Sequence, residues 1–464
     1  MRMRRWLPMV GLVLVLSACG SDENENAQVA AGGCETDGAR QVRSESALAA
    51  VPGNRFIIKF SQRAGARSLG TRRQRTQRMM SGLRQGGRVE EVGEDLSVLI
   101  LPEATTKSEL AKQLPAEEIE YIEPDAKVFA SFIPDDPKLS SQWAHAMIGS
   151  SAAWDISRGS ASVVVAVLDS GVDYTHPDLA ANMWKNPGEI AGNGIDDDGD
   201  GFVDDLYGWN FVSNNNSPMA DDGSFHGTHV AGTVGAVGDN GIGISGHSPK
   251  VKLMALKFLG SEGAGYTSDA IKGVNYAVDH GAKIINNSWG GSSKSQALSA
   301  AIDHARAAGV LFVVAAGNEG QNNDKVDAYP TNYPQDNLVR VAASNSSDKL
   351  VSWSNYGAKK VDLAAPGVNI YSTKNGNSYQ NLSGTSMATP LVSGVLATMI
   401  AVRPDLSYQQ IKGALLETVD VKSAYRGKVA WNGRVNAAKA LAEVVRLDVN
   451  WTPPDPPVGP GCTE

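Results

Sequence analysis

The feature that most constrains the fold is a series of short, largely apolar segments that alternate with amphipathic stretches. Apolar residues nearly fill residues 163–168, 251–259, 282–288, 310–316 and 338–343, as in strands buried on both faces. Helical patterns occupy residues 228–237, 268–280, 297–308 and 435–445. This alternation predicts an α/β domain with a parallel sheet covered by helices on both faces. Functional sites in such sheets form at the carboxyl ends of the strands.

A smaller α+β domain is expected before the α/β domain. Strand patterns at residues 54–61, 88–93, 96–102 and 119–130 and helical patterns at residues 69–85 and 107–114 give the order βαββαβ, which is ferredoxin-like. A Pro-Asp-Asp-Pro linker follows. The expected organisation is a leader at 1–18, a polar tether at 19–51, the small domain at 52–131, the α/β domain at 132–446 and a proline-rich tail at 447–464.

Charge is distributed unevenly along the chain. The whole chain has 42 Lys and Arg against 50 Asp and Glu, a formal net charge of −8, yet residues 55–88 hold ten basic residues and no acidic one. A basic run of this kind can be a nucleic-acid surface, a solvated helix face or a surface that docks on the acidic remainder of the chain. No stacking aromatic residues accompany the charges, which disfavours nucleic-acid binding.

The N-terminus has the pattern of a secretory signal. Three arginines precede an apolar run at residues 6–16 that is too short to span a bilayer. The run ends in Leu-Ser-Ala-Cys, which resembles a bacterial lipobox and implies that the thiol of Cys19 is lipidated before cleavage behind residue 18 leaves Cys19 as the new N-terminus. Gly20 rather than Asp then favours the outer membrane in a Gram-negative cell. An ordinary cleaved signal, with Cys19 incidental, is the alternative.

Cysteine usage excludes a disulfide scaffold, because an exported chain of 464 residues has only three cysteines. Stability must therefore come from a hydrophobic core, to which bound metal can add. Once Cys19 is lipidated, Cys34 in the tether and Cys462 in the tail remain. Whether these two pair, and so keep the cleaved parts together, stays open.

Three motifs place polar residues where such a sheet brings chemistry together. VAVLDSG puts Asp169 at the end of a buried strand, HGTHVAGT puts His226 at the start of a helix, and GTSMATP puts Ser386 at the head of another. A serine hydroxyl becomes a nucleophile when an imidazole takes its proton, and the imidazole needs a carboxylate to hold its tautomer. Alone, Asp169 would be a turn residue and Ser386 a helix cap. Together they predict acyl transfer.

With these motifs in the order Asp, His, Ser, residues 132–446 resemble the subtilisin-like serine proteases, the subtilases of peptidase family S8. The resemblance implies a subtilisin-like fold and an Asp169–His226–Ser386 triad. The segment AAGNEG places Asn318 where an asparagine of the family donates its side-chain amide to the oxyanion. His229 lies three residues further along the same helix as His226, and we expect it to be a packed structural residue.

Seven further residues match the substrate-binding surfaces of that family, which are two edges that pair with peptide backbone and the pocket beside the scissile bond. They are Gly263, Ala264, Gly265, Ser288, Trp289, Gly290 and Ala328. Main-chain pairing binds extended polypeptide with little regard to its side chains, which suits a broad endopeptidase. Many family members have glycine where this chain has Ala328, so we expect a shallower pocket.

An acidic loop at residues 193–205 has the pattern of a structural calcium site. Carboxylates alternate along NGIDDDGDGFVDD and a glycine permits a sharp turn. The twelfth position counted from Asp196 is Tyr207 rather than Glu, so the loop is not an EF-hand. The expected ligands are Asp196, Asp198, Asp200, the carbonyl of Phe202 and Asp205. The alternative, a solvated acidic loop, would crowd carboxylates without compensation.

The small domain, which ends in EYIEPD before the α/β domain, resembles the inhibitor-type propeptide of the subtilases. The resemblance implies a folding chaperone and temporary inhibitor that self-cleavage removes. Residues 127–132 would then lie in the active-site groove, and we expect cleavage between Val128 and Pro134. The basic run would help this domain find the acidic catalytic domain.

These expectations describe an exported, calcium-stabilised serine endopeptidase made as a self-processing precursor. Expected partners are polypeptide substrates, its own propeptide and the membrane through an N-terminal lipid, with no nucleic acid and a monomeric state. The precursor is expected at the outer membrane or cell surface, with release after processing left open. A non-catalytic adhesion protein is disfavoured because all four catalytic positions are present. A serine esterase is disfavoured because no Gly-x-Ser-x-Gly segment surrounds Ser386.

Overall fold

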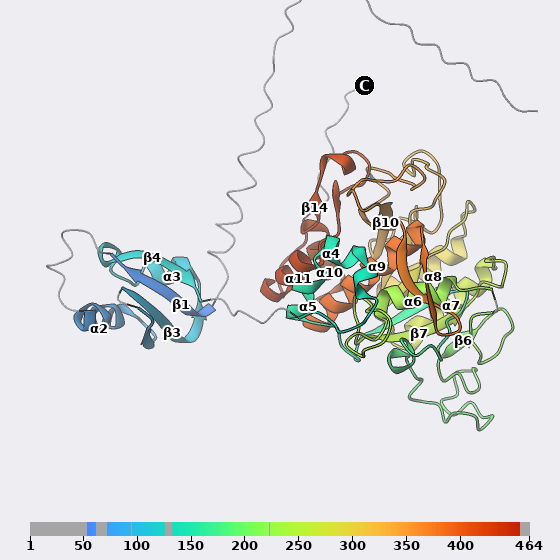
Figure 1. The fold of residues 1–464 in the computed structure, drawn as a ribbon, viewed down its shortest axis with the longest axis horizontal. Helices are drawn as coiled ribbons and strands as arrows, with labels where there is room; N and C mark the ends of the chain where they lie inside the picture. The colour runs from blue at the N-terminus through green and yellow to red at the C-terminus, as the bar shows by residue number, and fades with distance from the viewer. Residues whose placement is uncertain (1–52, 62–71, 94, 126–131, 222, 455–464) are drawn as a thin grey trace, which may run out of the picture. The chain divides into compact units, whose positions relative to one another are not determined.

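The computed structural model describes residues 53–61, 72–93, 95–125, 132–221 and 223–454. The expected signal peptide, the tether, Cys19, Cys34, Cys462 and residues 126–131 lie outside the described residues. The chain divides into two compact units, Met1–Lys127 and Val128–Glu464 (Figure 1). Each unit is described by itself.

The first unit is a four-stranded antiparallel sheet with two helices, in the expected order βαββαβ. Its strands follow the spatial order β2-β3-β1-β4. The elements are β1 (Gly53–Phe60), α2 (Arg72–Gly82), β2 (Arg88–Glu91), β3 (Leu96–Thr105), α3 (Lys107–Ala111) and β4 (Ile119–Pro124). Alternate residues of β1 and β3, including Phe56, Ile58 and Leu99, pack with Met79 of α2 and Leu110 of α3 to form its core.

The second unit is built on a nine-stranded sheet in the order β14-β15-β11-β10-β9-β8-β5-β7-β6. All neighbouring strands are parallel except the pair β14–β15. The strands are β5 (Val164–Asp169), β6 (Gly208–Asn210), β7 (Lys252–Lys257), β8 (Ile284–Asn287), β9 (Leu311–Ala315), β10 (Leu338–Ser344), β11 (Leu363–Pro366), β14 (Asp420–Val421) and β15 (Gly433–Arg434). The α/β class expected from the sequence is confirmed.

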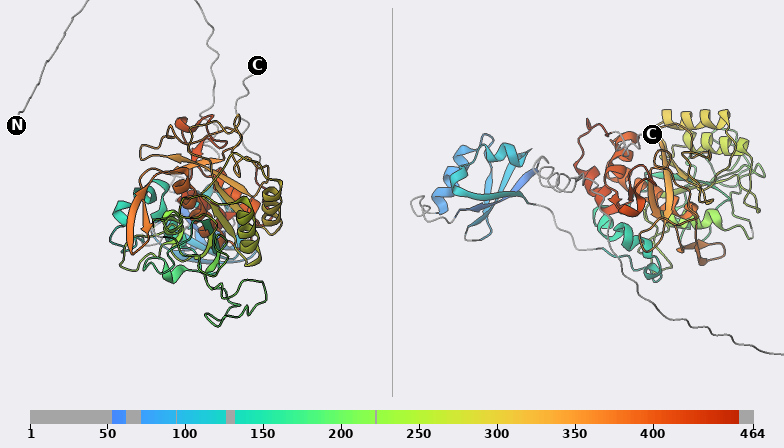
Figure 2. Two further views of the ribbon diagram at one scale, coloured as in Figure 1. Left: turned by 90° about the vertical axis from the view of Figure 1, so that its right-hand side faces the viewer. Right: turned by 90° about the horizontal axis from the view of Figure 1, so that it is seen from above.

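Both faces of the central strands are buried, which explains why these segments are apolar throughout. Along β5, Val165 and Val167 face one core cluster while Ala166 and Leu168 face the other. The first cluster includes residues of α6 (His226–Gly235) and α9 (Thr385–Val402), and the second includes residues of α7 (Thr267–Asp279) and α8 (Gln296–Ala307). Figure 2 shows α7 and α8 side by side.

Several elements were not expected from the sequence. They are α4 (Trp143–Ile148), α5 (Ser150–Ile156), α10 (Tyr408–Glu417) and the hairpin of β12 (Ile370–Lys374) and β13 (Ser378–Leu382). The final helix, α11 (Ala437–Arg446), was expected. The hairpin has mixed polarity because it packs on α6 through hydroxyl groups: Ser372 and Thr373 donate hydrogen bonds to carbonyl groups of that helix. Packed chain also continues past α11, since Gln410 donates to the carbonyl of Trp451 at 2.9 Å.

Among the described helices, α9 alone is long and apolar enough to cross a membrane, and 78% of that stretch is buried within the second unit. Such burial is typical of a core helix.

Candidate active site

Asp169 ends β5 and is fully buried. Its Oδ1 accepts a hydrogen bond from the backbone N–H of Ser170 at 2.7 Å and lies 2.8 Å from Nδ1 of His226. Since a carboxylate only accepts, Nδ1 of His226 carries the ring proton and Nε2 is left as the basic atom. The geometry therefore assigns the tautomer that a general base needs.

A glycine allows His226 to reach the end of β5. His226 is the first residue of α6 and Gly227 follows it. A Cβ on Gly227 would lie 2.2 Å from the carbonyl oxygen of Gly171 and 3.2 Å from Cβ of Asp169. Any side chain there would push the start of the helix away from the strand.

The pKa of His226 is raised above its ordinary value of 6.5. Burial acts to lower this pKa, but the charge of Asp169 and the hydrogen bond between the two side chains outweigh burial. A stronger base takes a proton from a hydroxyl more readily, so this shift suits a general base acting near neutral or alkaline pH.

Ser386 is the second residue of α9, and its hydroxyl is hydrogen-bonded to a backbone carbonyl rather than to the histidine. Its hydroxyl donates to the carbonyl oxygen of Ser288 at 3.0 Å and makes no hydrogen bond to His226 among the described residues. The two serines are also joined in the opposite direction, since Oγ of Ser288 donates to the carbonyl of Ser386 at 2.9 Å. A change of the staggered χ1 rotamer redirects the Ser386 hydroxyl without moving the backbone.

The side chain of Asn318 is held by the residue before Ser386. Its Oδ1 accepts from the backbone N–H and the hydroxyl of Thr385, at 2.9 and 3.0 Å. Because a backbone N–H needs an acceptor, the amide oxygen must face Thr385, and Nδ2 then points away from it. Neither Nδ2 of Asn318 nor the backbone N–H of Ser386 has a partner among the described residues, so both remain available as donors.

His226, Asn318 and Ser386 line one cavity of about 750 Å³. Of the residues expected to bind substrate, this cavity is also lined by Gly263, Ser288, Trp289, Gly290 and Ala328. Ala264 and Gly265 do not line it. A Cβ on Gly265 would lie 2.2 Å from the carbonyl of Phe258, so this glycine serves close packing beneath the edge.

Phe132 does not line this cavity, in contrast to the expectation that residues 127–132 lie in the groove. Its N–H donates to Oδ1 of Asp155 at 2.6 Å, and its ring lies 3.5 Å from the guanidinium carbon of Arg158. Its carbonyl accepts from Ser151 at 3.2 Å. The other residues of that segment lie outside those described.

His229 packs between α6 and the β12–β13 hairpin. Its Nε2 lies 2.9 Å from the carbonyl of Ile370 and 3.2 Å from that of Gln380. Burial lowers the pKa of His229 to about 4. A neutral, buried ring of this kind suits the structural role expected for it.

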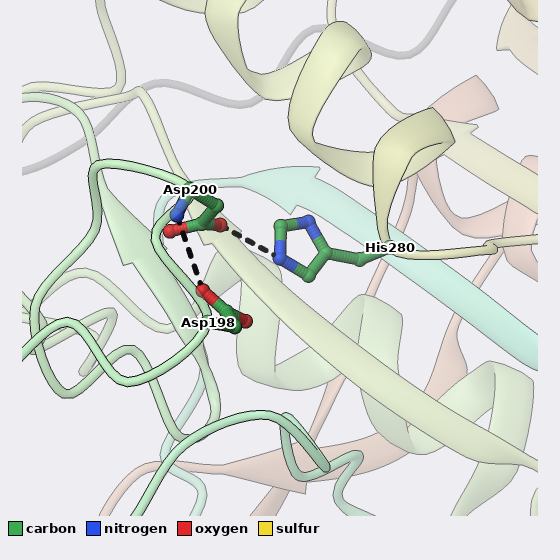
Figure 3. Close-up of side chains that lie close together, drawn as sticks. All are labelled: Asp198, Asp200 and His280. Carbon is green, nitrogen blue, oxygen red and sulfur yellow. Dashed lines mark hydrogen bonds and ion pairs between the residues drawn. The ribbon is translucent and has the colours of Figure 1, made fainter.

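The acidic loop brings its carboxylates together in two overlapping groups. In one group, ligand atoms of Glu189, Asp196 and Asp198 lie within 4.8 Å of one another. In the other, Asp198 and Asp200 meet His280 from the end of α7, whose Nε2 lies 2.9 Å from Oδ2 of Asp200 (Figure 3). Asp198 belongs to both groups.

Asp205 and Phe202 lie against the body of the second unit. Asp205 is fully buried, where it accepts hydrogen bonds from the hydroxyl of Tyr276 and from Nδ2 of Asn186. The ring of Phe202 packs edge-on against Tyr276 and Trp209. Oxygen atoms of Glu189, Asp196 and Asp198 form the hard donor set that Ca²⁺ prefers, whereas the imidazole of His280 does not belong to such a set.

Lys257 was missed as a site residue, although a lysine within an apolar strand is a recognisable signal. It is buried, and its Nζ donates to the carbonyls of Ser170 and Leu259 and to Oδ2 of Asp221, at 2.8, 2.9 and 2.9 Å. All three ammonium protons are therefore used. Ser170 and Leu259 line the cavity, so the hydrogen bonds of Lys257 connect two segments of the cavity wall.

No sequence pattern marks His280 as a site residue, because only the tertiary fold brings it to the acidic loop.

Comparison with known proteins agrees with this geometry. A model of the subtilase family matches residues 160–439. Thermitase of Thermoactinomyces vulgaris is 38% identical over 311 residues, which cover 67% of this chain and 99% of thermitase. A solved structure of a protease from Pseudoalteromonas arctica PAMC 21717 superposes with a TM-score of 0.55 at 33% identity, covering 67% of this chain and 99% of that one.

Longer relatives match as well. Subtilisin-like protease 1 of Plasmodium berghei is 35% identical over 299 residues, 61% of this chain and 50% of that protein. The counterpart from Plasmodium falciparum isolate 3D7 is 37% identical over 299 residues, 60% of this chain and 43% of that protein. The chain thus spans about half the length of these relatives or less.

Proposed function

Because this chain belongs to the subtilase family, we propose that it is an exported serine endopeptidase that hydrolyses peptide bonds with Asp169, His226 and Ser386. The observation that carries the proposal is the 2.8 Å contact between Asp169 and His226 at a cavity that Ser386 also lines. Relatives whose names describe them as proteases support the same activity.

In the proposed reaction, the hydroxyl of Ser386 turns from the carbonyl of Ser288 to Nε2 of His226. His226 takes the hydroxyl proton while Oγ of Ser386 attacks the carbonyl carbon of the peptide bond. Nδ2 of Asn318 and the backbone N–H of Ser386 donate to the oxyanion that forms. His226 then gives its proton to the leaving amine. Water hydrolyses the acyl-enzyme by the same steps in reverse order, while Asp169 stabilises the charged imidazole.

A fluorophosphonate probe tests the proposal, because it phosphonylates only an activated serine. Mass spectrometry of the labelled mature protein is expected to place the adduct on Ser386 and to show none in the chemically similar, exposed Ser383. A folded and processed chain without label on Ser386 would contradict the enzymatic function and favour a binding protein on the same fold.

Asn318→Asp separates the two roles of the Asn318 side chain. Aspartate keeps an oxygen for Thr385 but provides no N–H for the oxyanion, and its charge repels the oxyanion. We expect kcat to fall by about 10²–10³, the loss found when the corresponding donor is removed from subtilisin, while KM changes little. Steady-state kinetics with a peptide substrate measure both constants. A loss confined to KM would argue that Asn318 binds substrate rather than the transition state.

We also propose that the acidic loop binds structural calcium. Glu189, Asp196 and Asp198 supply the closest oxygen ligands, and Asp200, Asp205 and the carbonyl of Phe202 complete the candidate set. Bound calcium would offset the repulsion among these carboxylates and stabilise the loop that projects from the second unit between α5 and α6 (Figure 2).

Calcium removal is expected to lower the melting temperature. An ion present at about 100 times its Kd stabilises the folded state by about 2.7 kcal/mol, which a chelator would abolish. Asp198→Ala with Asp200→Ala should give the same loss, whereas Asp405→Ala, which removes a carboxylate from an exposed ion pair, should leave the calcium effect intact. Calorimetry of the Ser386→Ala chain avoids self-digestion. Equal melting temperatures with calcium and with chelator, and no heat of calcium binding, would exclude the site.

The first unit is proposed to be an inhibitory propeptide, and Cys19 to be lipidated. The βαββαβ order, the basic run and the position of this unit before the catalytic unit support the first proposal. The lipobox-like segment supports the second, and a lipid at Cys19 would hold the precursor at the membrane. Intact mass of the precursor from membranes, compared with Cys19→Ser, tests lipidation. Because lipidation precedes cleavage, the Cys19→Ser precursor should lack the mass of the lipid and retain residues 1–18.

A further inference from the structure

Phe132, the first described residue of the second unit, contacts α5 and the residues after it through three of its groups. Its backbone N–H donates to Oδ1 of Asp155 at 2.6 Å, and its carbonyl accepts from the hydroxyl of Ser151 at 3.2 Å. The guanidinium carbon of Arg158 lies 3.5 Å from the centre of its ring. These contacts hold residue 132 on its own unit.

The carboxylate of Asp155 has no cation as a partner among the described residues. It lies in the last turn of α5, which holds no basic residue, and the free carbonyl groups at the end of a helix disfavour negative charge. Arg158 forms an ion pair with Asp239 instead, at 3.7 Å. Within the described part of the chain, the N–H of Phe132 is the one donor to this carboxylate. Asp155 therefore binds a neutral amide at a place where a cation would bind more strongly.

The residues after Phe132 are held on the same unit. Pro134 is buried, and Asp136 accepts from the backbone N–H of Asp239 at 2.9 Å. Asp239 is also the partner of Arg158, whose guanidinium contacts the ring of Phe132. The second unit is thus anchored from residue 132 onward. A cut just before residue 132 would preserve all these contacts, whereas a cut after it would detach its ring and carbonyl.

We propose that self-processing cuts the bond between Ser131 and Phe132 and that Asp155 binds the new N-terminus. The inference rests on the proposed function of Ser386. Oγ of Ser386 bonds to the carbonyl carbon of Ser131 as the C–N bond breaks. The nitrogen of Phe132 leaves with the proton that His226 took from the serine, and water then releases Ser131 as a carboxylate.

This cut changes the group that Asp155 holds. The single N–H of an amide becomes an ammonium with three N–H groups, and a charge-assisted hydrogen bond is about twice as strong as a neutral one. Cuts at the other bonds between residues 128 and 134 leave no ammonium at this place. Because Phe132 does not line the cavity, an amine held at Asp155 is kept from the acyl-enzyme and cannot re-form the bond, which favours complete processing.

The first test is N-terminal sequencing of the mature protein. It should begin with Phe-Ile-Pro-Asp, residues 132–135. A mature chain that begins at any other residue would overturn the proposal.

Limited acetylation tests the role of Asp155, because only an unprotonated amine reacts. The mature protein is first blocked with the fluorophosphonate probe to stop self-digestion. At pH 7, the labelling of the Phe132 α-amine relative to the exposed Lys294 should be about threefold to tenfold slower than in Asp155→Asn. Asparagine keeps the acceptor oxygen and removes the charge. Asp303→Asn, which removes a carboxylate paired with Arg306 on α8, should leave the ratio unchanged. An equal ratio in Asp155→Asn would overturn the assignment.

The pH dependence of this labelling in the unsubstituted mature protein gives the pKa of the amine even if Asp155→Asn does not fold. Two charged groups face the amine: Asp155, which raises its pKa, and Arg158, which lowers it and is itself paired with Asp239. Because the carboxylate is in direct contact, we expect a pKa above the usual value of about 7.7–8.0. A value within or below that range would contradict an ammonium bound by Asp155.

The outcomes also separate this inference from the function on which it rests. A chain that carries the fluorophosphonate label on Ser386 but is uncut, or is cut at another bond, would contradict this inference alone. An uncut chain without label on Ser386 would overturn the proposed function and this inference with it.

Discussion

The Ser386→Ala chain is expected to remain an uncut precursor and to hydrolyse peptides slower by about 10⁶ in kcat. The size of this loss is that found when the nucleophile of subtilisin is removed, with residual rate from transition-state binding alone. In this chain the remaining donors would be Nδ2 of Asn318 and the backbone N–H of residue 386. Intact mass and N-terminal sequencing report processing, and a quenched peptide reports the rate.

The active chain should show a new N-terminus between Val128 and Pro134, and the exposed-serine variant Ser383→Ala should process normally. Processing of Ser386→Ala in purified form, without another protease, would contradict self-cleavage. A mature N-terminus before Ala126 or after Asp136 would contradict the proposed place of the cut. Phe132 lies against α5 rather than along the cavity, so a cut near it would leave a start of the mature chain already packed on its own unit.

A fall in pH from 6.5 towards 4 is expected to destabilise the second unit steeply. Burial lowers the pKa of His145 and of His229 to about 4 and that of His247 to about 3. Below pH 6.5 these histidines therefore bind protons in the unfolded chain but stay neutral in the folded chain. For each of them, the free energy of unfolding falls by about 1.4 kcal/mol for every unit by which the pH falls. Total stabilities are about 5–15 kcal/mol, so three such groups can decide the acid limit.

Hydrogen bonds explain why two of these rings must stay neutral. Nε2 of His145 lies 3.0 Å from the carbonyl of Ser245 and must donate to it, so its Nδ1 accepts from the hydroxyl of Ser150 at 2.9 Å. That hydroxyl in turn accepts from Nδ1 of His247 at 3.0 Å. Nε2 of His247 is buried without a partner among the described residues, so a proton there would create an unpaired charge.

His226 acts in the opposite sense. Because its pKa is raised, its contribution to stability is fully present below pH 6.5 and is lost as pH rises through the raised value. Below pH 6.5 this contribution is constant, so His226 does not offset the loss from the three buried histidines.

Urea denaturation of the Ser386→Ala chain at pH 7, 6 and 5 measures the acid loss. His247→Asn keeps a donor near Ser150 and removes the titrating ring, so the pH dependence should become shallower even if stability at pH 7 falls. His304→Asn, at an exposed position, should leave the slope unchanged. A slope that does not respond to His247→Asn would show that other groups control acid unfolding.

The sequence alone was sufficient to predict an element when the residue pattern of a segment directly reflects the burial of that same segment. The uniformly apolar runs predicted the central strands because both faces of each strand are buried within the same segment, as Val165 and Ala166 show. The same local patterns predicted that Asp169 lies at the end of a strand and that His226 and Ser386 lie at the starts of helices. The parallel sheet then brings these ends to one edge.

Residues that depend on contacts between distant segments could only be located in the tertiary structure. The acidic motif predicts carboxylates at alternate positions, but only the fold brings His280 to Asp200 and buries Asp205 against Tyr276. Ala264 matches the expected edge and yet does not line the cavity, while Glu262 two residues earlier does. The local pattern of a segment defines its own secondary structure and chemistry, whereas burial and neighbouring charge depend on how separate segments pack together.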